Sequence, residues 1–364
     1  MPDAASTREL ETAVRQLAPA SDCSCGSLAE EVSLLAERGW LRACLPRRWG
    51  GEGWGCGPAG TRDAFDALRA LGRANLSLAR LFEGHMNAVK LIALYGSEDT
   101  ASNAAKAIEE GALLGVWGAD DPAEPLDFDR RGDEVALTGV KRFASGLGLV
   151  EQAMVTVATT EGQQLLLVPA NEPERCDYSA WSMGGMRATR SGRYQFSGVS
   201  IRDDALIGAP GDYLREPHFE GGIWRYCAAH LGAAEALYHA MVEQLTDRKR
   251  ADDPSQHRRI VASAIAIESA RLWLLRAADE VEAAGAEGHK AALSMLAREA
   301  TEDACRLVME NVERALGMAA HVEGSFVHRT MRDLRLFLCQ ATPDAKRARA
   351  AKALAAMAAR AEQL

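Results

Sequence analysis

The amino-acid sequence predicts an α+β protein in which one β-rich segment lies between two helical ones. Residues 115–203 contain short apolar runs separated by turn sequences such as RRGDE and TTEGQ, a pattern typical of strands. Residues 76–95 repeat apolar side chains at intervals of three and four, and the chain after residue 223 does the same, which predicts amphipathic helices. Because the strands are grouped and do not alternate with helices, we expect separate layers and not a parallel sheet with crossover helices.

We expect an all-helical domain over residues 1–114, a β domain over 115–215 and a four-helix-bundle domain over 216–364. Within the β domain, Ser197 and Gly198 interrupt an alternating apolar pattern and predict a bulge in a half-buried strand.

The N-terminal helices are predicted from apolar spacing and from turn residues. Ser27 and Glu30 have the spacing of a capping box and predict a helix start there. Further helices are expected over residues 63–71, 76–95 and 97–110.

Four helices are expected to form the C-terminal bundle, because burying their apolar stripes against one another is the economical arrangement. Thr342 is the expected N-cap of the last helix and Pro343 its first residue. The four stretches are 224–245, 260–281, 289–316 and 343–362.

Composition excludes several classes of protein. The formal net charge of −9 disfavours nucleic acid or an anionic membrane as a partner. No apolar run approaches the roughly 18 residues of a membrane span, and the N-terminus lacks signal-peptide features, so a cytoplasmic protein is expected. The eight cysteines and eight histidines show no CxxC, HExxH or disulfide-framework spacing, so we expect no metal site.

Five segments, in order, resemble the acyl-CoA dehydrogenase family over nearly the whole chain. They are LAERGWLRACLPRRWGGEGWG, LYGSED, LTGVKRFASG, GMRATRSGRYQFSGVSI and RDLRLFLCQATPD. The resemblance implies a helical domain, a β domain and a helical bundle, with FAD between the last two and a second subunit of a homodimer or homotetramer completing the site. It also implies an acyl thioester as substrate, and an electron-transfer partner or oxygen to reoxidise the flavin.

The resemblance assigns several residues to the flavin. Phe143 stands where an aromatic ring packs on the cofactor, and Ser145 where a hydroxyl donates to its reactive edge. The loop after the flavin-lining residues departs from the family, because DDPAEPLD replaces TEPGAGSD. The flavin-lining residues themselves are Trp117, Gly118, Ala119 and Asp120.

The residues assigned to the thioester entrance and to cofactor contacts across the dimer match the family sequence less well. Arg187, Thr189 and Ser191 match the turn that faces the thioester entrance, although an arginine in a turn also fits a solvated surface. Arg248 and Gly317 are the nearest matches to cofactor contacts that cross the dimer, although the RxQFG motif itself is absent. Thr342 matches the cofactor-contacting threonine of the family's GTSE motif.

The catalytic base expected from the family is missing. Desaturation of an acyl thioester needs a carboxylate to remove the α-proton, yet Gln340 or Ala341 occupies its position, and neither accepts a proton. Glu220 is the carboxylate nearest the alternative base position on the first bundle helix. Asp344 is a further candidate, better explained as an acidic residue at a helix N-terminus.

Three functions follow. The first expectation is an FAD-dependent dehydrogenase of acyl-CoA or an acyl carrier, with a relocated base. The second is a flavin monooxygenase on the same fold, which needs no α-proton base, although no clear His or Asp set for activating a substrate stands out. The third is a non-catalytic protein that keeps the fold. Small residues along the first bundle helix, including Ala229 and Gly232, suit either an acyl pocket or close helix packing.

Overall fold

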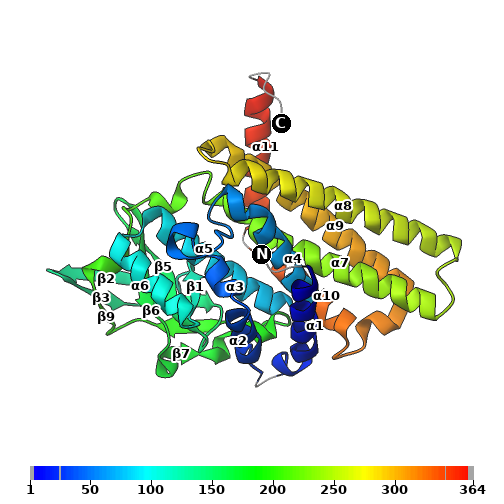
Figure 1. The fold of residues 1–364 in the computed structure, drawn as a ribbon, viewed down its shortest axis with the longest axis horizontal. Coiled ribbons are helices and arrows are strands. Elements are labelled where there is room, and N and C mark those ends of the chain that lie inside the picture. Colours follow the sequence, from blue (N-terminus) through cyan, green and yellow to red (C-terminus); the bar gives the residue numbers. More distant parts are fainter. Residues whose placement is uncertain (1–3, 24–25, 341, 360–364) are drawn as a thin grey trace.

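The structure is a computed structural model that describes residues 4–23, 26–340 and 342–359. Helices from both ends of the chain pack beside a group of small sheets (Figure 1). The predicted α+β fold with grouped helices and strands is confirmed. None of the described helices has the length and apolar character needed to cross a membrane.

The N-terminal helices agree with the prediction except at the start. Asn75 begins α5 by accepting hydrogen bonds from the backbone N–H groups of Ser77 and Leu78. The predicted capping box is wrong, because α2 begins at Ala29 without a side-chain hydrogen bond at its N-cap, and the Ser27 hydroxyl accepts from the Ala29 N–H. Helix α1 was not predicted. The helices are α1 Ala4–Ser21, α2 Ala29–Glu37, α3 Trp40–Ala43, α4 Thr61–Ala74, α5 Leu76–Tyr95 and α6 Glu98–Glu109.

The β region forms three small sheets, with strand orders β1-β5-β6-β10, β2-β3-β9 and β4-β8-β7. Only β1 and β5 pair in parallel within these described sheets. The strands are β1 Leu113–Trp117, β2 Asp127–Arg131, β3 Glu134–Thr138, β4 Val140–Ala144, β5 Val150–Thr159, β6 Gly162–Pro169, β7 Cys176–Asp177, β8 Gly192–Gln195, β9 Ser200–Arg202 and β10 Leu206–Ile207.

Ser197 and Gly198 do not form the predicted bulge within one strand. They form a turn that carries the chain from β8 in one sheet to β9 in another, with Gly198 at φ 83°. Glycine suits this turn because it reaches positive φ without a Cβ clash.

The C-terminal bundle differs from the prediction in its fourth member. Helices α7, α8 and α9 lie side by side, and α10, which was not predicted, packs against α7 and α5 (Figure 1). Helix α11 begins at Pro343 as expected but packs on α9 and projects from the molecule, because its apolar residues are mostly alanines without a wide stripe. The helices are α7 Trp224–Asp247, α8 Pro254–Glu282, α9 Ala291–Leu316, α10 Phe326–Phe337 and α11 Pro343–Ala359.

Small residues bring α4 and α7 close together. A Cβ built on Gly232 would lie 2.1 Å from the Arg69 carbonyl oxygen, and one on Gly72 would lie 2.1 Å from that of Ala229. These α7 positions therefore serve helix packing and not an acyl pocket.

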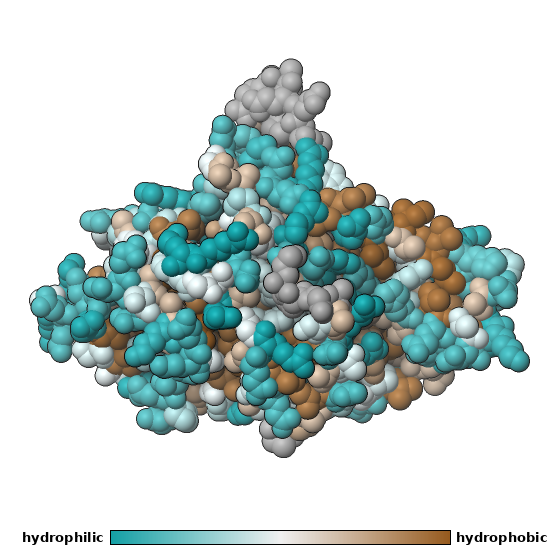
Figure 2. Space-filling view, viewed as in Figure 1, coloured by the Kyte–Doolittle hydropathy of each residue, from teal (hydrophilic) through white to brown (hydrophobic). Residues whose placement is uncertain are grey.

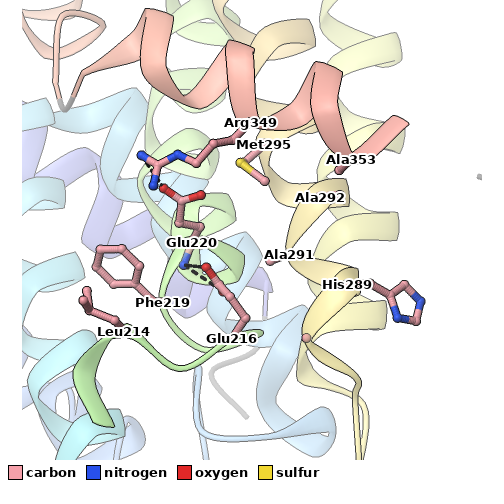
Figure 3. A pocket seen from close by; sticks show the side chains of 11 residues that line it. Leu214, Glu216, Phe219, Glu220, His289, Ala291, Ala292, Met295, Arg349 and Ala353 are labelled. Carbon is pink, nitrogen blue, oxygen red and sulfur yellow. Dashed lines mark hydrogen bonds and ion pairs between the residues drawn. The ribbon is translucent and has the colours of Figure 1, made fainter. Parts of the chain in front are cut away.

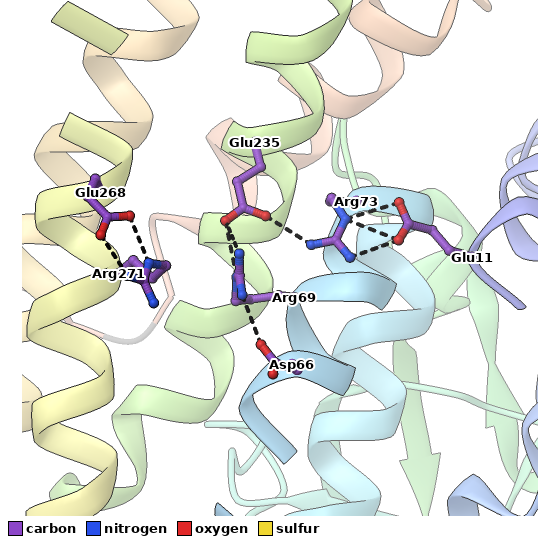
Figure 4. A network of polar contacts seen from close by, with 7 residues as sticks. All are labelled: Glu11, Asp66, Arg69, Arg73, Glu235, Glu268 and Arg271. Carbon is purple, nitrogen blue, oxygen red and sulfur yellow. Dashed lines mark hydrogen bonds and ion pairs between the residues drawn. The ribbon is translucent and has the colours of Figure 1, made fainter. Parts of the chain in front are cut away.

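A charged network reinforces the same junction (Figure 4). Glu235 on α7 lies 2.6 Å from Arg69 and 2.9 Å from Arg73 on α4, and Arg73 lies 2.8 Å from Glu11 on α1. The network ties α1, α4 and α7 together.

Candidate functional site

The predicted Trp117–Asp120 segment follows β1 and is anchored from inside the protein. The buried Trp117 ring packs on Tyr194 at 5.3 Å, and its Nε1 donates to the Ser145 carbonyl oxygen over 3.0 Å. Trp117 therefore links β1 to the turn after β4. The structure brings together two segments that were assigned to the same site.

Lys141 on β4 is a site residue that sequence reasoning missed. Its fully buried ammonium donates to Asp120 Oδ1 at 2.6 Å, to the Thr156 carbonyl at 2.5 Å and to the Gly118 carbonyl at 3.4 Å. Burial lowers the pKa of Lys141, and Asp120 opposes that shift. The lysine holds the Gly118–Asp120 backbone against β5. The adjacent Lys141 and Arg142 look alike in sequence, and only the structure shows that the lysine is the buried one.

Phe143 turns outward because β4 is irregular at this point. The pairing register of β4 with β8 shifts between Arg142 and Ala144, and Phe143 has φ 55°. A left-handed conformation is unusual for a bulky residue and is typically held by its surroundings. The ring is 45% exposed, although Lys141 two residues earlier is fully buried.

Trp181 and Ser145 complete an exposed surface that we call the Phe143 face. The Trp181 ring lies edge-on to Phe143 at 6.3 Å, and its buried Nε1 has no hydrogen-bond partner among the described residues. An exposed aromatic ring beside an unpaired N–H donor indicates a place for a flat molecule that carries acceptor atoms.

A chain of hydroxyl groups ends at the Phe143 face. Thr189 Oγ1 lies 2.7 Å from the Met186 carbonyl oxygen and 2.8 Å from Ser191 Oγ, and Ser191 donates to Ser145 Oγ at 3.0 Å. Ser145 Oγ in turn donates to the Phe143 carbonyl oxygen over 3.5 Å and is the last hydroxyl of the chain. Thr189 and Ser191 are buried in this chain, while Arg187 is exposed.

Glu220 lies elsewhere, beneath α11 (Figure 3). This buried carboxylate is 2.8 Å from Arg349 Nη2 and 3.6 Å from Lys346 Nζ, and its backbone N–H donates to Glu216. It lines a hollow of about 400 Å³ whose walls include Phe219. The Glu220 carboxylate therefore forms ion pairs with Arg349 and Lys346, both on α11.

The segment between α10 and α11 carries no carboxylate at the expected base position. Gln340 is half-buried and Thr342 is exposed with φ 49°, while Ala341 lies outside the described residues. Asp344 is exposed in the first turn of α11.

Arg248 and Gly317 lie at the ends of α7 and α9. Arg248 is exposed and contacts Gln244 on its own helix, and Gly317 follows the last residue of α9. The 24 residues of α7 span about 36 Å. Figure 1 shows this end of the bundle turned away from the sheets, so neither residue joins the Phe143 face of its own chain.

A second missed cluster lies between α7, α9 and α10. Tyr226 Oη, His230 Nε2 and Arg298 Nε are buried without hydrogen-bond partners among the described residues, and the His230 ring packs edge-on against Phe337 at 4.4 Å. Burial, and then Arg298, lower the pKa of His230 to about 3, so the imidazole is neutral. A histidine on an apolar helix face resembles a core residue in sequence, and only the packed structure shows its unpaired nitrogen.

Residues 218–339 match the model of the acyl-CoA dehydrogenase C-terminal domain. Dibenzothiophene monooxygenase of Mycolicibacterium goodii is 28% identical over 220 residues, which are 57% of this chain and 51% of that protein. The chain thus spans about half the length of that relative. A probable FMNH2-dependent monooxygenase, SfnC of Pseudomonas putida, is 25% identical over 79% of this chain and 76% of its own.

Solved structures match over almost the full length. Dibenzothiophene monooxygenase TdsC of Paenibacillus sp. A11-2 superposes with a TM-score of 0.81 at 20% identity and 95% coverage of both chains. A glutaryl-coenzyme A dehydrogenase complex superposes with a TM-score of 0.79 at 19% identity, covering 95% of this chain and 94% of that one. The bundle thus matches the acyl-CoA dehydrogenase C-terminal domain in sequence, and the chain as a whole has the acyl-CoA dehydrogenase fold.

Proposed function

We propose that this protein is a flavin-dependent monooxygenase that uses reduced FMN and dioxygen. The observation that carries the proposal is the absence of a free carboxylate at the two base positions of the family. Gln340 occupies one, and Glu220, the nearest to the other, is engaged by Arg349 and Lys346. No free carboxylate at these two positions could therefore remove an α-proton, whereas insertion of oxygen does not require such a base.

The Phe143 face fits a flavin ring. Phe143 offers an exposed aromatic surface, Trp181 a buried N–H that has no partner among the described residues, and Ser145 a hydroxyl held at the edge of the face by Ser191. The Trp117–Asp120 backbone, held by Lys141, would line the same ring. When bound, reduced FMN supplies two electrons to dioxygen, so that one oxygen atom enters the substrate and the other leaves as water.

FMN is favoured over FAD by motifs that the chain lacks. Arg248 and Gly317 are the nearest matches to the family's cofactor contacts across the dimer, but they stand in segments without the family motifs. The SfnC relative is described as FMNH2-dependent, and TdsC has been solved with FMN. A separate flavin reductase would supply the reduced cofactor.

The substrate we propose is a small, neutral heteroaromatic compound in place of an acyl thioester. Five relatives are named for dibenzothiophene, and TdsC has been solved with indole. His230 and the Tyr226 hydroxyl are uncharged polar groups beside α10, and the neighbouring Arg298 is paired with Glu299 and Glu302, which suits an uncharged ligand.

The test supplies purified protein with chemically reduced FMN, air and dibenzothiophene or indole. We expect oxygen uptake that depends on the substrate, and incorporation of one atom from ¹⁸O₂ into the product. Anaerobic bleaching of bound flavin by acyl thioesters would instead establish a dehydrogenase. A protein that binds neither FMN nor FAD would exclude both enzymes.

We also propose that α8 mediates self-association. Val261, Ile265 and Leu272 are 56%, 63% and 56% exposed on this helix, and Figure 2 shows apolar side chains over the same part of the molecule. In an antiparallel pair of α8 helices, Ile265 of one copy would face Leu272 of the other. Ile265→Glu should shift the sedimentation coefficient from dimer or larger to monomer, whereas Lys106→Glu, at an exposed position on α6, should not. A wild-type monomer would exclude this proposal.

A further inference from the structure

We propose that Asp333 on α10 is a positioning residue that sets the hydroxyl of Ser145 at the flavin. Asp333 is 4% exposed, and its Oδ1 accepts a hydrogen bond from the Met186 backbone N–H over 2.7 Å. A hydrogen bond to a buried carboxylate is stronger than one between neutral groups. Asp333 therefore fixes the start of the turn that carries Thr189 and Ser191.

The turn needs such an anchor because its backbone is strained. Met186 has φ 54° and Arg190 has φ 44°, both in the left-handed region that non-glycine residues rarely adopt. At its start, a Cβ on Gly185 would lie 2.7 Å from the Arg332 carbonyl oxygen, so α10 and the turn touch through their backbones. Without the Met186–Asp333 bond, the turn would relax toward ordinary φ values.

The chain of contacts from Asp333 to Ser145 is continuous. Met186 donates its N–H to Asp333 and accepts from Thr189 Oγ1 through its carbonyl. Thr189 contacts Ser191, and Ser191 donates to Ser145. The Thr189 carbonyl also accepts from the Gly146 N–H at 2.8 Å, next to Ser145. A shift of Met186 thus moves both the hydroxyl partner and the backbone neighbour of Ser145.

Asp333 is itself held by Arg332, which donates to it over 2.8 and 3.0 Å and also pairs with Asp22 after α1. The Arg332–Asp22 pair survives when Asp333 is changed, so no guanidinium is left uncompensated. The pair also provides a matched control, because Asp22→Asn alters the same network without touching Met186.

The inference rests on the proposed flavin site, and a double-mutant cycle tests it through FMN binding and the absorption spectrum of bound FMN. We expect Asp333→Leu and Ser145→Ala each to weaken FMN binding by about tenfold, the scale of one hydrogen bond of this kind. Because both changes act on one hydroxyl, the double variant should bind no more than about twofold worse than either single variant. Asp333→Asn, which keeps the acceptor, and Asp22→Asn should stay within about threefold of wild type.

Additive losses in the double variant, or an unchanged FMN spectrum in Asp333→Leu, would overturn the role of Asp333. Failure of the wild type to bind FMN would instead refute the proposed function. If Asp333→Leu does not fold, Thr189→Val and Ser191→Ala interrupt the same chain, and each must also be non-additive with Ser145→Ala.

Discussion

The ammonium of Lys141 lies 2.6 Å from Asp120 Oδ1 and joins the strand that carries Phe143 to the segment that follows β1. Lys141 is fully buried, whereas the Asp120 side chain is 32% exposed. The Lys141–Asp120 ion pair therefore holds the backbone directly behind the Phe143 face. The pair gives a prediction that separates stability from cofactor binding.

Lys141→Met should lower the free energy of unfolding by about 2 kcal/mol. Breaking a fully buried ion pair costs about 3 to 5 kcal/mol, and here water reaches Asp120 and reduces the loss. Urea unfolding measures the change, and Lys106→Met, at an exposed position on α6, is the control. FMN binding should weaken in the first variant only. Equal stability of both variants would show that the buried pair contributes nothing.

Glu235→Gln should destabilise the protein by about 1 to 2 kcal/mol, because it leaves Arg69 and Arg73 without their shared carboxylate. Glu268→Gln is the matched control, since Glu268 pairs with Arg271 on the exposed side of α8 (Figure 4). That change should leave the urea midpoint where it is. A similar shift in both variants would mean that burial of the network does not matter.

The sequence predicted the elements whose periodicity is strong and missed those that depend on tertiary contacts. Helix α5 was predicted from its apolar repeat alone, and the structure adds its Asn75 cap, whereas α10 mixes arginines with leucines in RDLRLFLC and becomes recognisable only when packed on α7. Lys141 and His230 were missed for a related reason. A sequence shows a charged or polar residue in an apolar stretch but not which atoms lie opposite it.

The resemblance to a known family supplied Phe143, Ser145, Thr189 and Ser191, and the structure places them in one connected region. It did not supply Asp333, because nothing local links that residue to Met186, 147 positions earlier. Such long-range anchors are set by how the helical and β parts pack.

His85 should make the protein less stable in acid. Its Nδ1 accepts from the Leu114 N–H at 3.1 Å and its Nε2 donates to the Leu41 carbonyl at 3.0 Å, so the neutral ring is satisfied on both sides. Burial lowers the pKa of His85 from 6.5 to about 4. Below pH 6.5 the unfolded chain binds a proton that the folded chain does not, so stability falls as the pH drops from 6.5 toward 4.

Between pH 7.5 and 5.0 this histidine should account for about 2 kcal/mol of lost unfolding free energy. Glutamine offers one donor and one acceptor in a similar place, so His85→Gln should fold. Its unfolding free energy should fall by about 2 kcal/mol less than that of wild type between pH 7.5 and 5.0. Urea unfolding at both pH values measures the difference. The same pH dependence in variant and wild type would remove His85 as its source.

Glu220→Gln distinguishes the two enzyme chemistries. If Glu220 only holds α11, its neutralisation should leave FMN binding and oxygen-dependent turnover within about twofold, because its partner Arg349 is half exposed and such pairs contribute under about 1 kcal/mol. Hydrogen exchange over residues 343–359 should become faster. If Glu220 instead removed an α-proton, turnover of an acyl thioester should fall by about 10² to 10⁴.

Arg349→Gln is the control for this experiment, because it breaks the same ion pair and keeps the carboxylate. We expect it to speed exchange in α11 as Glu220→Gln does, with turnover unchanged in both. A loss of turnover in Glu220→Gln but not in Arg349→Gln would contradict the structural role of Glu220. Such a result would favour a dehydrogenase over a monooxygenase, because turnover would then require the Glu220 carboxylate itself.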